Sequence, residues 1–118
     1  MQLNEVRYSG LLPVEGYGPG FFRIGGQLHP GSVLVQAERV APWDGFSDVA
    51  PLLALAGAVD VLFVGTGAEI APLPAPLRHE LEEAGMGVEM MATPSACRSY
   101  NVLLSEGRRV AAALLPVD

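Results

Sequence analysis

The residues best suited to chemistry lie in a glycine-rich turn that follows an apolar run and in a helix start further along the chain. If the strands before these two stretches are parallel neighbours, free backbone N–H groups, two threonine hydroxyls and a guanidinium meet at one edge of a sheet. Groups of these kinds bind anions, and the positive end of a helix dipole adds to the attraction. We therefore predict a ligand-binding cleft for a small anion or small molecule, formed by Gly65, Thr66, Gly67, Thr93, Cys97 and Arg98.

The glycine pattern also has a plainer interpretation. A Gly-x-Gly turn is a weak signal, because the full dinucleotide fingerprint needs a third glycine three residues later, where this chain has Ile70. In the plainer interpretation, Gly65 and Gly67 only permit the turn, and Arg98 pairs with a surface acid. The sequence favours this second interpretation and predicts no cofactor.

Cys97 is the only cysteine, and it falls near the start of a predicted helix. A thiol there can have a lowered pKa and act as a nucleophile, but it needs a base. The two histidines, His29 and His79, have no evident link to it in the sequence. We therefore interpret Cys97 as a small buried apolar residue, and we predict no catalytic residue and no metal site.

The elements that position the cleft alternate along the second half of the chain. Val61 to Val64 is an unbroken apolar run, which is typical of a strand covered on both faces. We predict that Thr93 caps a helix with Pro94 at its first position, which is a strong signal for a helix start. From residue 47 onward the pattern is helix, strand, helix, strand, helix, strand, which favours a mostly parallel sheet with helices on its faces.

The predicted elements form one α/β domain over residues 1–118, with an extended N-terminal segment at 1–20. We predict that the first third is a small β-meander, and that a helix capped by Ser47 runs to Gly57. The remaining predictions are strands at 21–24, 27–29, 32–35, 39–43, 59–64, 87–91 and 110–115, and helices near 72–84 and 93–105.

Composition narrows the class of protein. The 118 residues carry a formal net charge of −6, with thirteen acids, seven arginines and no lysine, so nonspecific nucleic-acid binding is not expected. A lone cysteine fits a reducing compartment. The longest apolar stretch is broken by Asp60 and is too short to span a bilayer, and the first residues are unlike a signal sequence. We expect a soluble, cytoplasmic protein without membrane insertion.

Three stretches together resemble a known family. They are residues 60–67, residues 77–90, and above all the long run from Thr93 through Cys97, Arg98 and Tyr100 to Leu114. From about Gly20 to the C-terminus the chain resembles the bacterial and archaeal family of unknown function that also contains mitochondrial respiratory complex I assembly factor three. It looks like a bacterial member.

The resemblance implies a three-layer α/β fold, with a mixed, mostly parallel central sheet flanked by helices and a small N-terminal β-layer. It also implies that the last strand is antiparallel to the others. For function it implies a non-enzymatic assembly factor for complex I or another inner-membrane complex, with complex subunits or other assembly factors as partners. The alternative from the residues themselves is a small-molecule or anion-binding protein, or an enzyme, that uses the predicted cleft.

Overall fold

The computed structural model describes residues 10–118, which form eight strands and three helices. The strands are β1 Val14–Gly18, β2 Phe21–Ile24, β3 Gln27–Pro30, β4 Val33–Gln36, β5 Arg39–Pro42, β6 Val61–Thr66, β7 Gly87–Met91 and β8 Val110–Leu115. The helices are α1 Ala50–Leu53, α2 Ala75–Glu83 and α3 Thr93–Ser105.

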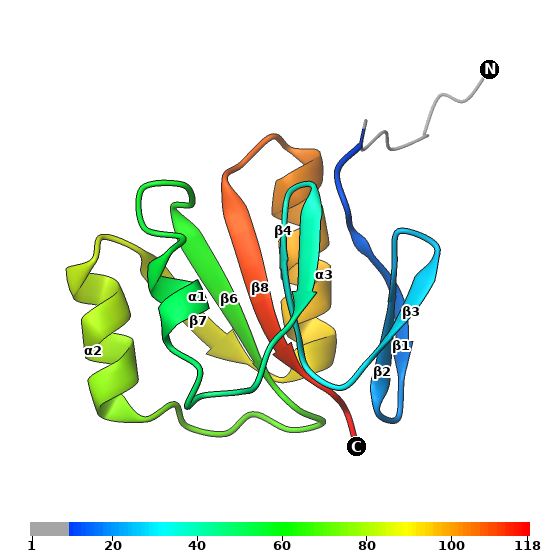
Figure 1. The fold of residues 1–118 in the computed structure, drawn as a ribbon, viewed down its shortest axis with the longest axis horizontal. Helices are drawn as coiled ribbons and strands as arrows, with labels where there is room; N and C mark the ends of the chain where they lie inside the picture. The colour runs from blue at the N-terminus through cyan, green and yellow to red at the C-terminus, as the bar shows by residue number, and fades with distance from the viewer. Residues whose placement is uncertain (1–9) are drawn as a thin grey trace.

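The strands form two sheets, which Figure 1 shows side by side. A small antiparallel sheet has the order β1-β2-β3, and a five-stranded mixed sheet has the order β5-β4-β8-β6-β7. In the larger sheet β6 is parallel to both β7 and β8, whereas β4 is antiparallel to β5 and β8. The predicted fold class, a mixed α/β sheet flanked by helices with a small β-layer, is confirmed.

One implied feature of the sheet is wrong. The last strand, β8, is parallel to β6 rather than antiparallel, and it pairs antiparallel only with β4. The reason is the crossover through α3, which leaves the end of β7 and returns the chain to the far side of β6 in the same direction. As a result β8, not β6, is the central strand of the larger sheet.

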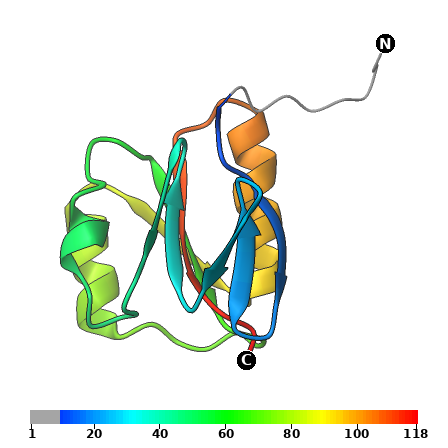
Figure 2. The same ribbon diagram turned by 45° about the vertical axis from the view of Figure 1, so that its right-hand side comes forward.

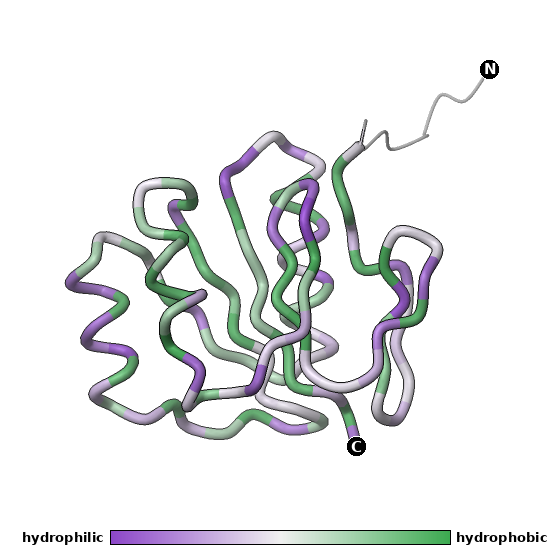
Figure 3. Tube along the Cα trace, viewed as in Figure 1, coloured by the Kyte–Doolittle hydropathy of each residue, from purple (hydrophilic) through white to green (hydrophobic). Residues whose placement is uncertain are grey.

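The central strand separates two cores. Its alanines alternate between the faces: Ala112 belongs to a cluster with Phe63 and Tyr100, and Ala111 and Ala113 belong to a second cluster. All three alanines are fully buried, and their small side chains let elements pack closely on both sides of the sheet. Figure 3 shows the matching hydrophobic colouring along β6 and β8.

Each face of the larger sheet has its own cover, and Figure 2 shows the layers. Helix α3 and the inner face of the small sheet cover one side, where Phe22 and Ile24 join the cluster around Tyr100. Helices α1 and α2 cover the other side together with Trp43, whose ring lies in that core and donates from Nε1 to the Asp48 carbonyl at 3.0 Å.

Several predictions for the first half of the chain need correction. The β-meander is divided, because β4 and β5 join the larger sheet instead of the small one. Helix α1 has only four residues and begins after Val49, so Ser47 does not cap it. Residues 14–18, which the sequence analysis places in the extended N-terminal segment, form β1; residues 1–9 of that segment lie outside the described residues.

Candidate functional site

The carboxyl ends of β6 and β7 lie next to each other, as the prediction of the cleft requires. The two strands are parallel neighbours, with Gly65 opposite Met91, and α3 begins two residues after β7 ends. The strand runs through Gly65 to Thr66 before the chain turns, so only Gly67 of the predicted turn lies outside it. The glycine segment and the helix start therefore meet at one sheet edge.

Thr93 joins the elements at this edge, although it is not the helix cap that the sequence predicts. The position before the helix is Ala92, and no side chain caps it. Instead the Thr93 hydroxyl donates to the Leu115 carbonyl at 2.6 Å and accepts from the Gly67 N–H at 2.9 Å. The Thr93 N–H also donates to the Gly67 carbonyl at 2.8 Å. We call this set of contacts the Thr93 junction; it connects β6, α3 and β8.

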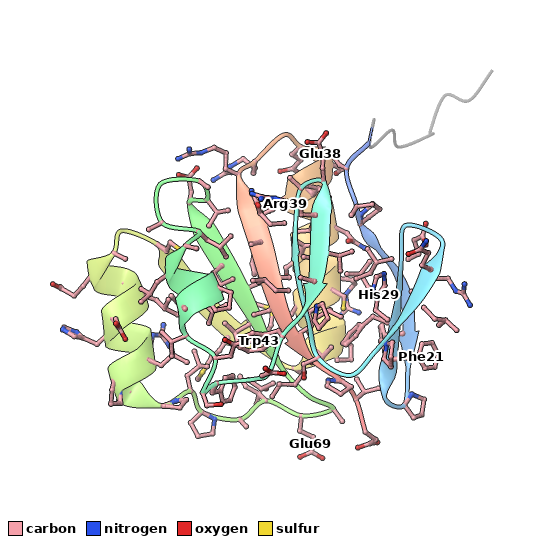
Figure 4. All side chains as sticks on the ribbon, viewed as in Figure 1. Phe21, His29, Glu38, Arg39, Trp43 and Glu69 are labelled. Atoms are coloured by element: carbon pink, nitrogen blue, oxygen red, sulfur yellow. The ribbon has the colours of Figure 1, made fainter. Side chains whose placement is uncertain are left out.

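The polar groups of the Thr93 junction are satisfied within the protein. Thr93 is completely buried, and its hydroxyl makes one bond as donor and one as acceptor. The Thr66 hydroxyl accepts from the Ala71 N–H at 3.0 Å, and its single proton is shared between the carbonyls of Glu69 and Met91 at 2.9 and 3.2 Å. An anion would have to replace these bonds, and the Glu69 carboxylate extends outward at the same end of the molecule (Figure 4).

The two glycines of the junction have different reasons to be glycine. Gly67 has a φ of 107°, in the left-handed region that disfavours side chains. Gly65 has ordinary strand backbone, but a Cβ there would lie 2.7 Å from Thr93 Oγ1 and 2.9 Å from Leu114 Cδ2. Gly65 therefore permits the close approach of α3 to β6, which a larger residue would prevent.

Cys97 lies on the buried face of α3, in the core cluster with Phe63 and Tyr100. Burial raises the pKa of the Cys97 thiol to about 12, although the charge of Arg98 acts in the opposite direction. At neutral pH the group is therefore a protonated thiol, which is a poor nucleophile. His29 lies in the small sheet with Nε2 at 3.3 Å from the Ile24 carbonyl, and His79 is exposed on α2.

Arg98 is exposed, and within residues 10–118 its one hydrogen bond joins Nη2 to Ser95 Oγ at 3.4 Å. Its side chain lines a groove of about 430 Å³ on the flank of α3. We call it the α3 groove; its lining residues are Phe63, Arg98, Ser99, Val102 and Leu103. None of them belongs to the Thr93 junction. The structure therefore brings Gly65, Thr66, Gly67 and Thr93 together at one sheet edge, whereas Cys97 lies in the core under α3 and the Arg98 side chain lies on the helix flank.

Two further residues of α3 have roles that the sequence analysis missed. The Asn101 side chain accepts from the Val14 N–H at 2.8 Å and donates from Nδ2 to the Val14 carbonyl at 2.9 Å, as a neighbouring strand would. The Tyr100 hydroxyl donates to the Leu12 carbonyl at 2.9 Å. The only sequence signal for Asn101 was a polar residue at the border of the helix's apolar face.

The described part of the chain holds few groups arranged for catalysis. In residues 10–118 no three side chains of the metal-ligating types gather around a common point. Every buried side-chain nitrogen or oxygen in these residues has a hydrogen-bond partner. Outside the junction, the pKa of the Asp60 carboxyl is lowered by its hydrogen bond from Arg109 (2.6 Å). This exposed pair lies just before the amino ends of β6 and β8, at the sheet edge opposite to the junction.

No helix within residues 10–118 is long and apolar enough to cross a membrane. Taken together, the geometry shows a satisfied polar junction at one sheet edge and an open groove on the adjacent helix flank. Side chains of the groove remain available to a second molecule, since Val102 is 52% exposed in it.

Comparison with known proteins gives three useful matches. A family model described as "Protein of unknown function (DUF498/DUF598)" matches residues 14–115. An uncharacterized protein of Rhodobacter capsulatus is 58% identical over 99% of this chain and 94% of its own length. NADH dehydrogenase (ubiquinone) 1 alpha subcomplex assembly factor 3 of Danio rerio is 34% identical over 87% of this chain and 63% of its own length.

The fold also has a solved relative. The crystal structure described as that of an outer membrane protein from Bartonella henselae matches with a TM-score of 0.83 and 34% identity, over 95% of this chain and all of the other. The chain therefore shares its overall fold with that protein.

Proposed function

Because the chain belongs to the family of proteins of unknown function DUF498/DUF598, we propose that it is a non-enzymatic binding protein that assists the assembly of a membrane protein complex. The observation that carries this proposal is the 34% identity to a protein named as a complex I assembly factor. Relatives with that name suggest an assembly role for the family. Respiratory complex I, or another complex of the inner membrane, is the target that we propose for this chain.

The side chains support binding rather than chemistry. The thiol of Cys97 is buried and protonated at neutral pH, with no base beside it among the described residues. The hydroxyls of Thr66 and Thr93 are held by backbone groups, so neither is poised to attack a substrate. The net charge of −6 favours protein partners over nucleic acid. We propose complex subunits or other assembly factors as partners, and the cytoplasm as the location, since a lone unpaired cysteine fits a reducing compartment.

A deletion strain of the source organism tests this proposal. We expect less assembled complex I, or less of another inner-membrane complex, on native gels of the membranes. We also expect lower NADH oxidation with quinone as acceptor, and recovery when the gene is restored on a plasmid. Normal amounts of every respiratory complex in the deletion strain, together with an unrelated metabolic defect, would contradict the proposal.

A second candidate function is binding of a small anion at the Thr93 junction, and one observation favours it: the β6 end and the start of α3 meet at the same edge. The residues at that edge would be Gly65, Thr66, Gly67 and Thr93; of the other two predicted site residues, Cys97 lies in the core under α3 and the Arg98 side chain on the helix flank, so Arg98 would have to change its orientation to contribute. The Gly67 N–H and the Thr93 hydroxyl already bond each other, so an anion would have to compete with that contact.

Titration with phosphate or sulfate decides this second candidate. Binding at the junction would shift the amide resonances of residues 65–67 and 95–97 at millimolar anion, while those of the small sheet stay in place. If the resonances do not move, the junction serves structure only.

A further inference from the structure

The two flanks of α3 differ, because a strand packs against one of them and the α3 groove lies on the other. On one flank of α3, the strand β1 packs against the helix, and Asn101 bonds the backbone of Val14 on both its polar groups. On the other flank, next to β6 and β7, no element of residues 10–118 covers the helix, as the placement of the strands in Figures 1 and 2 shows. The groove of about 430 Å³ lies on that second flank.

The lining of the α3 groove is mainly apolar and partly exposed. The Phe63 ring forms its floor from β6, and Leu103 and Val102 line it from the helix. Val102 is 52% exposed, which leaves an aliphatic side chain in water on an otherwise amphipathic helix. Covering this side chain and its neighbours would remove apolar surface from water, which favours association.

Two polar side chains of the α3 groove lack strong partners. Arg98 forms no ion pair within residues 10–118 and has only the long contact to Ser95 Oγ at 3.4 Å. The Ser99 hydroxyl lies 3.7 Å from the Met91 sulfur, which is a weak acceptor. A guanidinium without an ion-pair partner is well suited to bind a carboxylate. It is also a local positive charge in a chain with thirteen acidic residues.

The outer edge of β7 is a less suitable place for the same partner. Arg78 Nη2 donates to the Val88 carbonyl at 3.2 Å, while its Nε pairs with Glu82 at 3.1 Å. A charged side chain over an edge strand discourages the addition of another strand. The occupant therefore lies on the sheet face beside α3, not at the edge of β7.

We propose that the α3 groove binds an extended segment of a partner protein in which apolar side chains flank one aspartate or glutamate. The apolar side chains contact Phe63, Val102 and Leu103, and the carboxylate pairs with Arg98. The segment takes the position on this flank that β1 takes on the other. The proposal rests on the proposed assembly function for its biological setting, but the binding itself is measurable without it. Glu89 is an exposed acid on β7 and the cross-strand neighbour of Phe63, so it disfavours a second carboxylate on that side of the groove.

The test uses the ¹⁵N-labelled full chain and three short, end-capped peptides of alternating leucine and serine. Their central residue is glutamate, glutamine or lysine. We expect the glutamate peptide to shift amide resonances of residues 98–103 and of Phe63, and to bind more tightly than the lysine peptide. In Arg98→Gln the preference for glutamate over glutamine should fall by about two- to fivefold, the range for an exposed ion pair.

Matched variants distinguish binding in the α3 groove from nonspecific binding to exposed apolar side chains. Val102→Ser should weaken the glutamate peptide by about tenfold or more, because it removes a buried aliphatic contact. Ile70→Ser, which changes an aliphatic residue that is 62% exposed in a loop, should leave binding unchanged. Equal weakening by both variants, tighter binding of the lysine peptide, or no shift with any peptide would overturn the proposal.

Two further measurements show whether a partner segment or a second copy of the chain fills the α3 groove, and whether the groove serves the proposed assembly function. Sedimentation at rising concentration should show a monomer; a dimer that Val102→Ser abolishes would mean that a second copy fills the groove, and would overturn the proposal. In the deletion strain, folded Val102→Ser should fail to restore complex assembly while Ile70→Ser restores it. If the peptide results hold but both variants restore assembly, the groove binds peptides and is not the assembly surface, so the partner assignment is wrong.

Discussion

Gly65 lies so close to the first turn of α3 that an added methyl group has no room. A Cβ would be 2.7 Å from Thr93 Oγ1 and 3.0 Å from Thr93 Cα, a backbone atom that cannot move alone. We predict that Gly65→Ala lowers the free energy of unfolding by about 1–3 kcal/mol, the usual cost of overpacking, and that Gly65→Val costs more. Urea denaturation measures the change.

The control for Gly65 is Gly16→Ala, because a Cβ at Gly16 in β1 has nothing within 4 Å and the backbone there is ordinary. It should be neutral or slightly stabilising. Equal stability of Gly65→Ala and the wild type would show that α3 can move away from β6 at no cost. The cost at Gly65 comes from packing; the backbone conformation that disfavours a side chain belongs to Gly67.

The buried thiol of Cys97 makes the free energy of unfolding fall at alkaline pH. Because burial raises the pKa of Cys97 from 9.0 to about 12 in the folded protein, the unfolded chain loses its thiol proton first as the pH rises. The stabilising contribution is complete below pH 9 and is lost as the pH approaches 12. In this window we predict that the free energy of unfolding falls by up to about 1.4 kcal/mol per pH unit more than in Cys97→Ala.

Denaturant titrations at several pH values compare the wild type with Cys97→Ala. The ionisation of tyrosine and arginine contributes equally to the pH dependence of both proteins, so the difference reports on the thiol. Parallel alkaline slopes would mean that the thiol ionises normally in the folded state. A second readout is alkylation by iodoacetamide at pH 8, which should require unfolding of the native protein.

At the level of the elements, α3 is the part of the fold that holds others in place. Asn101 bonds the backbone of Val14 on one flank, and Thr93 bonds both β6 and β8 at the start of the helix. We predict that Asn101→Ala loosens β1 without unfolding the larger sheet, because Val14 then loses both partners on the helix. Hydrogen exchange should show faster exchange at residues 12–18 and unchanged protection in β6 and β8.

Asn101→Asp is a sharper comparison, because the carboxylate still accepts from the Val14 N–H but cannot donate to its carbonyl. Its effect on exchange should lie between those of the wild type and Asn101→Ala. Global loss of protection in either variant would contradict a local role for this contact.

The elements differ in how far the sequence determines them. The strand β7 has the predicted bounds and α3 lies where it is predicted, because the Gly85 that ends the preceding helix and the Thr-Pro start are local signals. The strand β1 was missed because Gly16 and Gly18 are typical of turns; in the structure the Phe21 ring lies over Gly18, 2.5 Å from a possible Cβ. Such a contact depends on a neighbouring strand, which local patterns do not contain.

The candidate site was predictable to a similar extent. The alternation of helices and strands predicts that the ends of β6 and β7 meet, and they do. It does not predict that the Thr93 hydroxyl faces Gly67 and Leu115 instead of capping α3. That contact depends on the exact distances between three elements, which local patterns do not contain. The α3 groove depends on which flank of a helix other elements leave uncovered, a property of the whole fold.

Across the whole molecule, the two cores share one sheet. The cluster around Tyr100 contains Phe22 of the small sheet, and the cluster on the opposite face contains Trp43, with β8 contributing alternate residues to both. Loss of either core exposes one face of the same strands. We therefore predict that residues 10–118 unfold in one transition, including the small sheet.

Phe22→Ala tests this coupling, because it perturbs one core while the fluorescence of Trp43 reports on the other. Phe22 is completely buried, so its truncation should lower the free energy of unfolding by about 3–5 kcal/mol. Trp43 is the only tryptophan and lies in the opposite core, 3% exposed. Its fluorescence and the far-UV circular dichroism should therefore shift together to lower denaturant concentration, with coincident midpoints. Phe21→Ala, on the outer face of the same strand, should shift both far less. A fluorescence midpoint that stays at the wild-type value while the dichroism changes in two steps would show that the small sheet and α3 form a unit separate from the core around Trp43.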